Sequence, residues 1–268
     1  MSYAFIGLGN MAAAILRGMR QSGRYDHDAI WGYDVLAAQV QALQDDVGLT
    51  PAHSVAEAAG QADVIVLAVK PQMMAEVLKG LKDSLTPQKL VVTIAAGLPL
   101  HFYEDILGTD IPLVRVMPSL NARVQAAASS MCWNAAATED HRATARAVFE
   151  SVGTVEELPE HLFAAFSAIA GAAPAFAFQF VDALASAGVK AGLPRALAKR
   201  TASQMMLGSA KLLQQSPEHP RQLMDQVCSP GGTTIQGVHA LAKHGFDAAV
   251  HAAVDAVIEK DQALGRKL

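Results

Sequence analysis

The stretch Gly7-Leu8-Gly9-Asn10-Met11-Ala12 decides the fold of this chain. It fits the pattern G-x-G-x-x-A. The first glycine permits a tight turn, the second lets the backbone approach a pyrophosphate, and the small last residue keeps helix and strand close. A strand-like segment at 3–6 precedes the motif and an amphipathic segment through Met19 follows it, which is the context that the motif requires. The stretch therefore predicts a dinucleotide-binding strand, turn and helix.

Asp34 extends this motif. It ends a second expected strand, 29–33, about 20 residues beyond the motif, where an acidic residue accepts a hydrogen bond from the ribose 2′-hydroxyl of NAD. Residues 35–37 include no arginine for the 2′-phosphate of NADP. We therefore expect NADH to be accepted at least as well as NADPH. The alternative is that Asp34 caps the helix that follows.

Strands and helices alternate through the first half of the chain. Apolar runs at 64–69, 90–94 and 113–117 are typical of strands buried on both faces. The other elements expected here are helices at 74–82 and 138–151 and strands at 126–133 and 154–157. This alternation predicts an α/β fold, with a Rossmann-type dinucleotide-binding domain over 1–158 whose parallel sheet has helices on both faces.

The second half of the chain changes character near Leu158-Pro159-Glu160, and an all-α domain is expected over 159–268. Its helices are predicted at 164–170, 175–188, 194–213, 222–227, 234–244 and 248–264. The segment 176–181 is apolar nearly all round, and a small helical domain has little capacity to bury it alone. We expect a dimerisation domain; the alternative is a core helix packed against the first domain.

Composition excludes several classes of function. The 268 residues carry a net charge of −4 with no basic run longer than two residues, so nucleic acid is not an expected partner. No apolar stretch is expected to reach the length of a membrane span, and no basic signal-peptide segment is expected at the start of the chain. Two distant cysteines, Cys132 and Cys228, indicate reduced thiols and a cytoplasmic location. The nine histidines show no metal-ligand spacing, and no metal is expected.

The cofactor residues are expected where the strands of the sheet end, because ligands of open α/β sheets bind beyond the carboxyl ends. Lys70 is either catalytic, solvated, or, as Pro71 favours, part of a loop that passes over the cofactor. Small residues at 95–97 admit a flat ring. The expected cofactor contacts are Gly7, Gly9, Asn10, Met11, Asp34, Ala68, Val69, Lys70, Pro71, Ala95, Ala96 and Gly97.

A second motif, Cys228-Ser229-Pro230-Gly231-Gly232-Thr233-Thr234, interrupts the helical half. Pro-Gly-Gly ends one helix, and the two threonines open another apolar-periodic run. Such a helix start presents free N–H groups and hydroxyls, which suit a carboxylate. The alternative is an ordinary capped helix after a glycine turn.

These features suit hydride transfer. A nicotinamide supplies the chemistry itself, and the protein supplies placement. An iminium substrate needs a carboxylate anchor, a hydrogen bond to its ring nitrogen and a dry pocket, and the helix start at Thr233 and Thr234 offers the first two. We find no Ser-His-Asp arrangement and no acidic pair of recognisable spacing.

The chain resembles the Δ1-pyrroline-5-carboxylate reductase family from end to end. The resemblance rests on both motifs above and on the segments 69–72, 95–97, 114–118 and 225–227. It implies reduction of pyrroline-5-carboxylate to proline with NADPH or NADH, in a homodimer or a ring of dimers. It also implies that Thr234 is catalytic, through a hydrogen bond to the ring nitrogen. The implied substrate contacts are Ser229, Gly231, Gly232, Thr233, Thr234 and Met117.

Two segments depart from the family pattern. Ser119-Leu120-Asn121 replaces Asn-Thr-Pro, and Ala172-Ala173 stands in the Gly-Ser-Gly-Pro-Ala motif. They leave open a reductase of another cyclic imine, or a cofactor-binding protein without turnover. A β-hydroxyacid dehydrogenase is a further alternative, but its helical lysine has no counterpart in 164–173.

Overall fold

The computed structural model describes residues 1–265. The chain forms two compact units, which we call the sheet unit, Met1–Ala172 with the stretch from Ile258, and the helical unit, Ala173–Val257. The division into 1–158 and 159–268 stays a prediction, and residues 266–268 lie outside the described part. The connector 159–172 belongs to the sheet unit, because its residue contacts are mainly with that unit.

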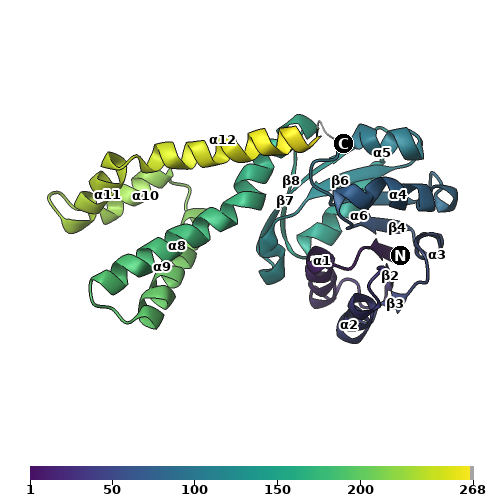
Figure 1. Ribbon diagram of the computed structural model, residues 1–268, viewed down its shortest axis with the longest axis horizontal. Coiled ribbons are helices and arrows are strands. Elements are labelled where there is room, and N and C mark those ends of the chain that lie inside the picture. The colour runs from purple at the N-terminus through teal and green to yellow at the C-terminus, as the bar shows by residue number, and fades with distance from the viewer. Residues whose placement is uncertain (266–268) are drawn as a thin grey trace. The chain divides into compact units, whose positions relative to one another are not determined.

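The sheet unit is built on one eight-stranded sheet in the order β3-β2-β1-β4-β5-β6-β7-β8 (Figure 1). Its strands are β1 Ser2–Ile6, β2 Ala29–Tyr33, β3 Thr50–Pro51, β4 Val64–Leu67, β5 Leu90–Thr93, β6 Leu113–Met117, β7 Ala127–Trp133 and β8 Gly153–Glu157. All neighbours pair in parallel except β6 and β7. Chain order reverses at β1, which lies between β2 and β4 and so marks the switch point where such sheets bind ligands.

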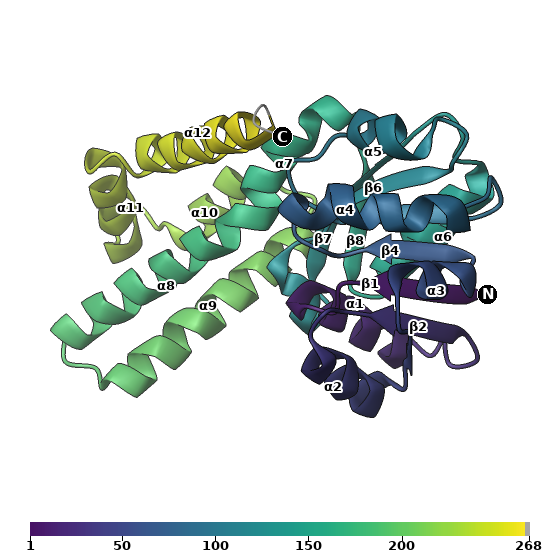
Figure 2. The ribbon, with the colours of Figure 1, turned by 45° about the vertical axis from the view of Figure 1, so that its right-hand side comes forward.

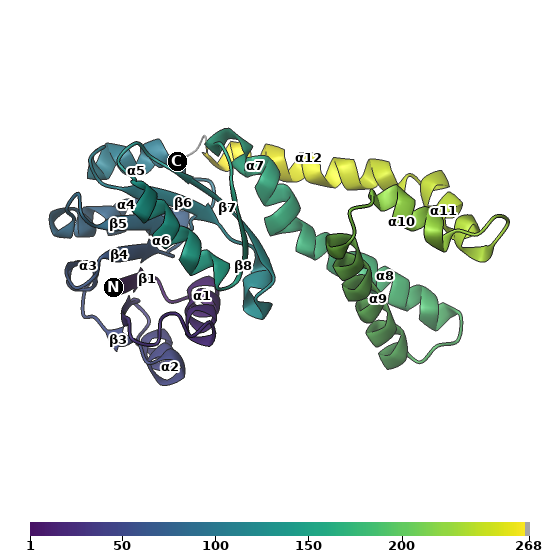
Figure 3. The same ribbon diagram turned by 180° about the vertical axis from the view of Figure 1, so that it is seen from behind.

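Helices cover both faces of this sheet (Figures 2 and 3). They are α1 Asn10–Gln21, α2 Ala37–Val47, α3 Val55–Gly60, α4 Pro71–Leu81, α5 Leu100–Leu107 and α6 Glu139–Glu150. Side chains of β1 alternate between two cores, because successive residues of a strand point to opposite faces. Phe5 packs with residues of α1 and α6, whereas Ile6 packs with residues of α3, α4 and α5.

The Rossmann-type prediction is confirmed, and the differences lie at element ends and in short elements. The predicted strands 64–69 and 90–94 end earlier, at Leu67 and Thr93, and the helix predicted at 74–82 already begins at Pro71. Proline suits this first helical position because the missing N–H would have no intrahelical partner there. Strand β3 and helices α3 and α5 were not predicted, and α2 is the helix that was expected after Asp34 without bounds; β3 and α3 are too short to display a period.

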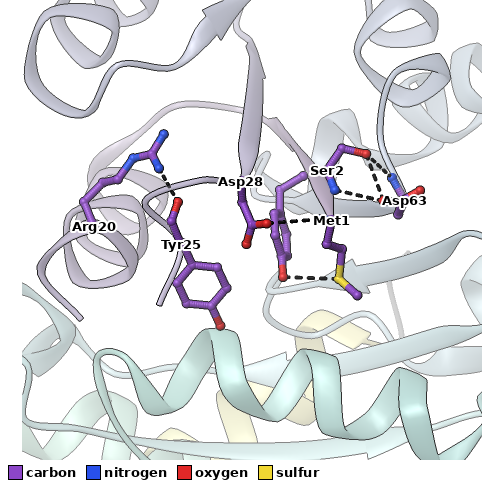
Figure 4. A network of polar contacts seen from close by, with 7 residues as sticks. Met1, Ser2, Arg20, Tyr25, Asp28 and Asp63 are labelled. Carbon is purple, nitrogen blue, oxygen red and sulfur yellow. Dashed lines mark hydrogen bonds and ion pairs between the residues drawn. The ribbon is translucent and has the colours of Figure 1, made fainter. Parts of the chain in front are cut away.

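A polar network ties the amino-terminal end of the sheet together (Figure 4). The Met1 ammonium pairs with Asp28 at 3.1 Å, and the Ser2 N–H donates to Asp63 at 2.8 Å. Tyr3 and Tyr25 are buried and meet edge to face, 5.5 Å between ring centroids. Because this network lies at the opposite strand ends from the switch point, its role is stability rather than ligand binding.

The helical unit holds α8 Ala173–Lys190, α9 Arg195–Gln215, α10 Pro220–Val227, α11 Thr233–Lys243 and most of α12 Phe246–Gly265. Helices α8 and α9 form an antiparallel hairpin (Figure 3). The unit has little interior, since the buried hydrophobic cluster within it consists of Ala185, Ala198 and Ala202. Phe178 is 61% exposed.

The expectation that no apolar stretch reaches the length of a membrane span is wrong. The helical stretch Glu160–Lys190, which runs through the connector into α8, is long and apolar enough to cross a membrane, with a mean hydropathy of 1.6 over its most apolar window. Isolated polar residues interrupt the stretch in sequence, but the helix continues past them through a short π-helical segment, η4 Ser167–Ala172.

Candidate active site

A cavity of about 310 Å³ opens at the carboxyl ends of β1, β2 and β4, at the switch point of the sheet. Six of the predicted cofactor residues line it: Gly7, Gly9, Asp34, Ala68, Val69 and Lys70. Apolar side chains complete its wall, namely Ile6, Val35, Leu36, Met73 and Val77. The cavity is therefore a mostly apolar slot beside a glycine-rich turn, which suits a nucleotide.

The two glycines of the turn meet different requirements. Gly7 has φ +90°, and a Cβ there would lie 2.9 Å from the carbonyl of Ala68, so only glycine fits. Gly9 has an ordinary φ of −71°, and no atom lies within 4 Å of where its Cβ would be. Free space beside Gly9 is what a pyrophosphate would occupy, and this observation fits a dinucleotide.

Helix α1 begins directly at this free space. Gly9 is its N-cap residue and has no side chain to satisfy the first N–H groups, which belong to Asn10, Met11 and Ala12. These groups and the positive end of the helix dipole suit an anionic ligand. Asn10 and Met11, both predicted cofactor contacts, thus form the first turn beside the cavity.

Asp34 holds the glycine-rich turn in place. Its Oδ2 accepts from the Leu8 N–H at 2.7 Å and its Oδ1 from the Leu36 N–H at 2.8 Å. The alternative that Asp34 caps the next helix is wrong, because α2 follows Leu36 as its N-cap residue and has no side-chain cap. Asp34 still faces the cavity, and the bond to Leu8 is a contact that sequence reasoning missed.

Lys70 and Pro71 form the start of α4. Lys70 is the exposed N-cap residue of α4 and lines the cavity, and Pro71 is the first residue of the helix. The expected loop over the cofactor is therefore a tight β4–α4 turn, with Ala68 donating its N–H to the Ile6 carbonyl at 2.8 Å.

The turn Ala95–Pro99 follows β5 and lines a separate depression with Arg115, Glu160 and Phe163. Its start is anchored by Thr93, whose Oγ1 accepts from the Ala95 N–H at 3.3 Å and lies 2.6 Å from the Tyr103 hydroxyl. Burial raises the pKa of Tyr103 to about 12, so this hydroxyl stays protonated at neutral pH. Ala95, Ala96 and Gly97 are therefore not among the residues that line the cavity at the switch point.

Met117 ends β6, and a Cβ added at Gly171 of the π-helical segment would lie 3.7 Å from its Cε. Ser119, in one of the departing segments, is buried and accepts from the Ala128 N–H at 3.3 Å. Its hydroxyl therefore serves the β6–β7 connection. Helix segments of the π type often mark functional positions.

The second motif forms the turn between α10 and α11 in the helical unit. Gly231 has φ +70°, and the Gly232 N–H donates to the Ser229 carbonyl at 3.0 Å. A Cβ on Gly232 would come 2.3 Å from the Ser229 Oγ. Gly232 is the N-cap residue of α11, which has no side-chain cap, so Thr234 does not cap this helix. Thr233 and Thr234 are exposed in the first turn of α11.

The thiol of Cys132 is unsuited to nucleophilic chemistry. Cys132 is buried, and burial, with Glu160 as a second cause, raises the pKa of its thiol to about 12. Within residues 1–265, no group of three or more His, Cys, Asp or Glu side chains could hold a metal ion.

Comparison with known proteins identifies relatives over the whole length. The family model "Pyrroline-5-carboxylate reductase dimerisation" matches residues 160–264, and "NADP oxidoreductase coenzyme F420-dependent" matches residues 2–97. The pyrroline-5-carboxylate reductase of Escherichia coli is 41% identical over 98% of this chain and 97% of that relative. The enzyme of Methanosarcina acetivorans is 39% identical with the same coverage.

Solved structures of pyrroline-5-carboxylate reductases are also similar to this chain. A 1-pyrroline-5-carboxylate reductase from Streptococcus pyogenes matches with a TM-score of 0.88 and 33% identity over 98% of both chains. A Plasmodium falciparum pyrroline carboxylate reductase with NADP bound matches with a TM-score of 0.86 and 31% identity, covering 99% of this chain and 98% of the other. By fold, motifs and identity over nearly its full length, the chain belongs to the pyrroline-5-carboxylate reductase family.

Proposed function

We propose that this protein reduces pyrroline-5-carboxylate to L-proline with NADH or NADPH, as the last step of proline synthesis. The single observation that carries this proposal is the pair of motifs in one chain: a glycine-rich turn with free space at Gly9, and an uncapped helix start at Thr233. The first suits a dinucleotide and the second suits a carboxylate. Family membership supports the same reaction.

The sheet unit would hold the cofactor through its own backbone. N–H groups of Asn10 and Met11 suit the pyrophosphate, and the apolar wall with Val35 and Leu36 suits the adenine. We place the nicotinamide beside Ala95, Ala96 and Gly97, with Val69, Lys70 and Pro71 along its path. When bound, the cofactor supplies the hydride, and these residues orient it and exclude water.

The substrate would be anchored by the turn before α11. In this proposal the backbone N–H groups around Gly231 and Gly232, with Ser229 and Thr233, bind the carboxylate. The Thr234 hydroxyl donates or accepts at the ring nitrogen and steadies it as that nitrogen becomes an amine. Met117 contributes an apolar wall. Two such contacts fix the angle between the ring and the hydride donor, which is the main task of the protein here.

NADH is proposed to be accepted at least as well as NADPH. Asp34 lines the cavity with its carboxylate, and residues 35–37 hold no cation to bind a 2′-phosphate. Within residues 1–265, the wall of this cavity contains one positively charged side chain, that of Lys70. A carboxylate facing the ribose disfavours the phosphate of NADPH by charge repulsion.

The protein is an oligomer in this proposal, because the helical unit leaves Phe178 and other apolar side chains exposed. A homodimer through the helical unit would cover them and would account for the apolar helix without a membrane. Assembly of dimers into a ring and a cytoplasmic location, with Cys132 and Cys228 as free thiols, complete the proposal.

One assay tests the activity. Purified protein, reduced cofactor and pyrroline-5-carboxylate are mixed between about pH 6 and 8, and the loss of cofactor absorbance is followed. Imine-dependent oxidation, with proline as product, is expected. A six-membered cyclic imino acid run in parallel measures ring-size preference. Cofactor binding without turnover on either imine would overturn the proposed reaction.

A further inference from the structure

A carboxylate distant in sequence holds the end of the turn that follows β5. Helix α5 begins at Leu100 after Pro99, and no side chain from its own N-cap position accepts a hydrogen bond. Glu160 supplies the acceptor instead: its Oε1 accepts from the Leu100 N–H at 2.8 Å. A first-turn N–H that would otherwise lack a partner is thereby bound to a charged oxygen.

The carboxylate is itself fixed by a cation. Arg115 Nη1 donates to the same Glu160 oxygen at 2.7 Å. The Arg115 side chain is only 9% exposed, and its guanidinium stacks over Phe163, 4.6 Å from the ring centroid. Glu160 therefore has one well-defined position, unlike an acid in an exposed ion pair, because the buried arginine leaves it little freedom.

The other end of the turn is fixed independently. Arg115 pairs with Thr93 in the β5–β6 register, and Thr93 binds both the Ala95 N–H and the Tyr103 hydroxyl. The turn Ala95–Pro99 is consequently held at its start by Thr93 and at its end by Glu160. Within it, Gly97 has φ +76°, a conformation that the two anchors help to maintain.

We propose that Glu160, oriented by Arg115, is a positioning residue for the nicotinamide end of the cofactor. The inference rests on the proposed function, which places the nicotinamide beside Ala95, Ala96 and Gly97. Glu160 does not touch the cofactor in this proposal. It acts through the turn, and a turn displaced by about 1 Å costs a large part of the rate of a hydride transfer.

The test compares two ligands on three variants. NADH carries the nicotinamide, and ADP-ribose lacks it. Dissociation constants for both are measured by calorimetry for the wild type, Glu160→Ala and Glu160→Gln. Glu157→Ala is the matched control, since Glu157, the last residue of β8, pairs with Arg146 of α6 and, within residues 1–265, has no hydrogen bond to the turn. Melting temperatures of all four proteins are recorded.

In Glu160→Ala we expect NADH to bind about 10-fold more weakly and kcat to fall at least as much, with ADP-ribose unchanged. Glu160→Gln keeps the acceptor oxygen, so it should retain most of the affinity for NADH and most of kcat. Equal weakening of the two ligands, or no change in either, would overturn the proposal. If Glu160→Ala does not fold, the ratio of the NADH to the ADP-ribose dissociation constant is compared between Glu160→Gln and the wild type, and a smaller increase in this ratio is expected. Wild-type protein without imine reduction would defeat the proposed function, while the two binding constants remain measurable.

Discussion

At the scale of single residues, Thr234 is the proposed catalytic contact. It lies in the first turn of α11, with Gly232 as the N-cap residue, and its side chain is exposed. A threonine at this position has no capping bond to lose. Its hydroxyl is therefore free for a ligand, and its effects on stability and on turnover can be separated.

Thr234→Ala should lower kcat strongly, on the order of 100-fold, because the ring nitrogen loses its partner and the imine its orientation. Thr234→Ser should keep much of the activity. Since no cap is lost, the melting temperature of Thr234→Ala should stay close to the wild-type value. Steady-state kinetics and thermal unfolding of the two variants check this. Full turnover in Thr234→Ala would remove the residue from the catalytic contacts.

Asp34 has an observed role in holding the glycine-rich turn and a proposed role in cofactor choice, so its replacement needs two variants. Asp34→Ala removes both the charge and the acceptor of the Leu8 N–H. Asp34→Asn removes the charge and keeps one acceptor oxygen. We expect both to raise the NADPH to NADH ratio of kcat/KM, with weaker binding of both cofactors only in Asp34→Ala. An unchanged ratio in both variants would mean that Asp34 serves the loop alone.

At the scale of elements, the β1–α1 turn shows two glycines with opposite requirements. Gly7→Ala places a Cβ against the Ala68 carbonyl at φ +90°, and should lower the free energy of unfolding by about 1–3 kcal/mol. Gly9→Ala meets no atom and should unfold as the wild type does. Gly9→Ala should still bind NADH about 10-fold more weakly or worse, because its methyl group fills the pyrophosphate space.

Calorimetric unfolding without cofactor and NADH titration of the same two proteins separate these effects. A Gly9→Ala protein with wild-type affinity for NADH would show that no phosphate approaches this turn. The comparison is informative because one substitution tests the fold and its near neighbour tests the ligand.

The amino-terminal end of the sheet predicts an alkaline limit to stability. Burial, helped by Asp28 and Glu150 and opposed by Arg24, raises the pKa of Tyr25 from its ordinary value to about 12. The folded state therefore holds this proton more tightly than the unfolded state. Its contribution is complete below about pH 10, the ordinary pKa of tyrosine, and is lost as the pH rises toward 12. Burial also raises the pKa of neighbouring Tyr3.

Urea unfolding at several pH values checks this expectation. The wild-type free energy of unfolding should fall steeply above about pH 10, and Tyr25→Phe should show a shallower fall because the Tyr25 phenol is no longer there to ionise. Parallel curves for the two proteins would contradict it.

At the scale of the whole molecule, the helical unit is incomplete by itself. Its buried hydrophobic cluster is three alanines, while Phe178, Leu207 and Leu212 are 61%, 62% and 56% exposed. A groove of about 660 Å³ along α8, α11 and α12 is lined mostly by apolar side chains, among them Phe176, Phe180 and Phe246. An obligate dimer is the expected way to cover these surfaces.

Sedimentation at low micromolar concentration should therefore show no folded monomer. Phe178→Glu should abolish the dimer and with it most of the folded, active protein, because a charge would be buried in the interface. Val124→Glu is the control: Val124 is 69% exposed but belongs to the sheet unit, so the dimer should persist. A stable and active monomer of either the wild type or Phe178→Glu would refute obligate dimerisation.

Local sequence patterns were enough to predict the Rossmann-type sheet, the helical second half and the turns that carry the candidate site. These features follow from local patterns, namely the regular spacing of apolar residues and the glycines that tight turns require. The short elements β3 and α3 could not be predicted, because a few residues do not show the regular spacing of apolar side chains that identifies a strand or a helix. The three-dimensional fold, by contrast, was needed to find that Asp34 bonds to Leu8, 26 residues away, and that Glu160 bonds to Leu100, 60 residues away. The packing of strands and turns brings such hydrogen-bond partners together, and no local pattern in the sequence predicts them.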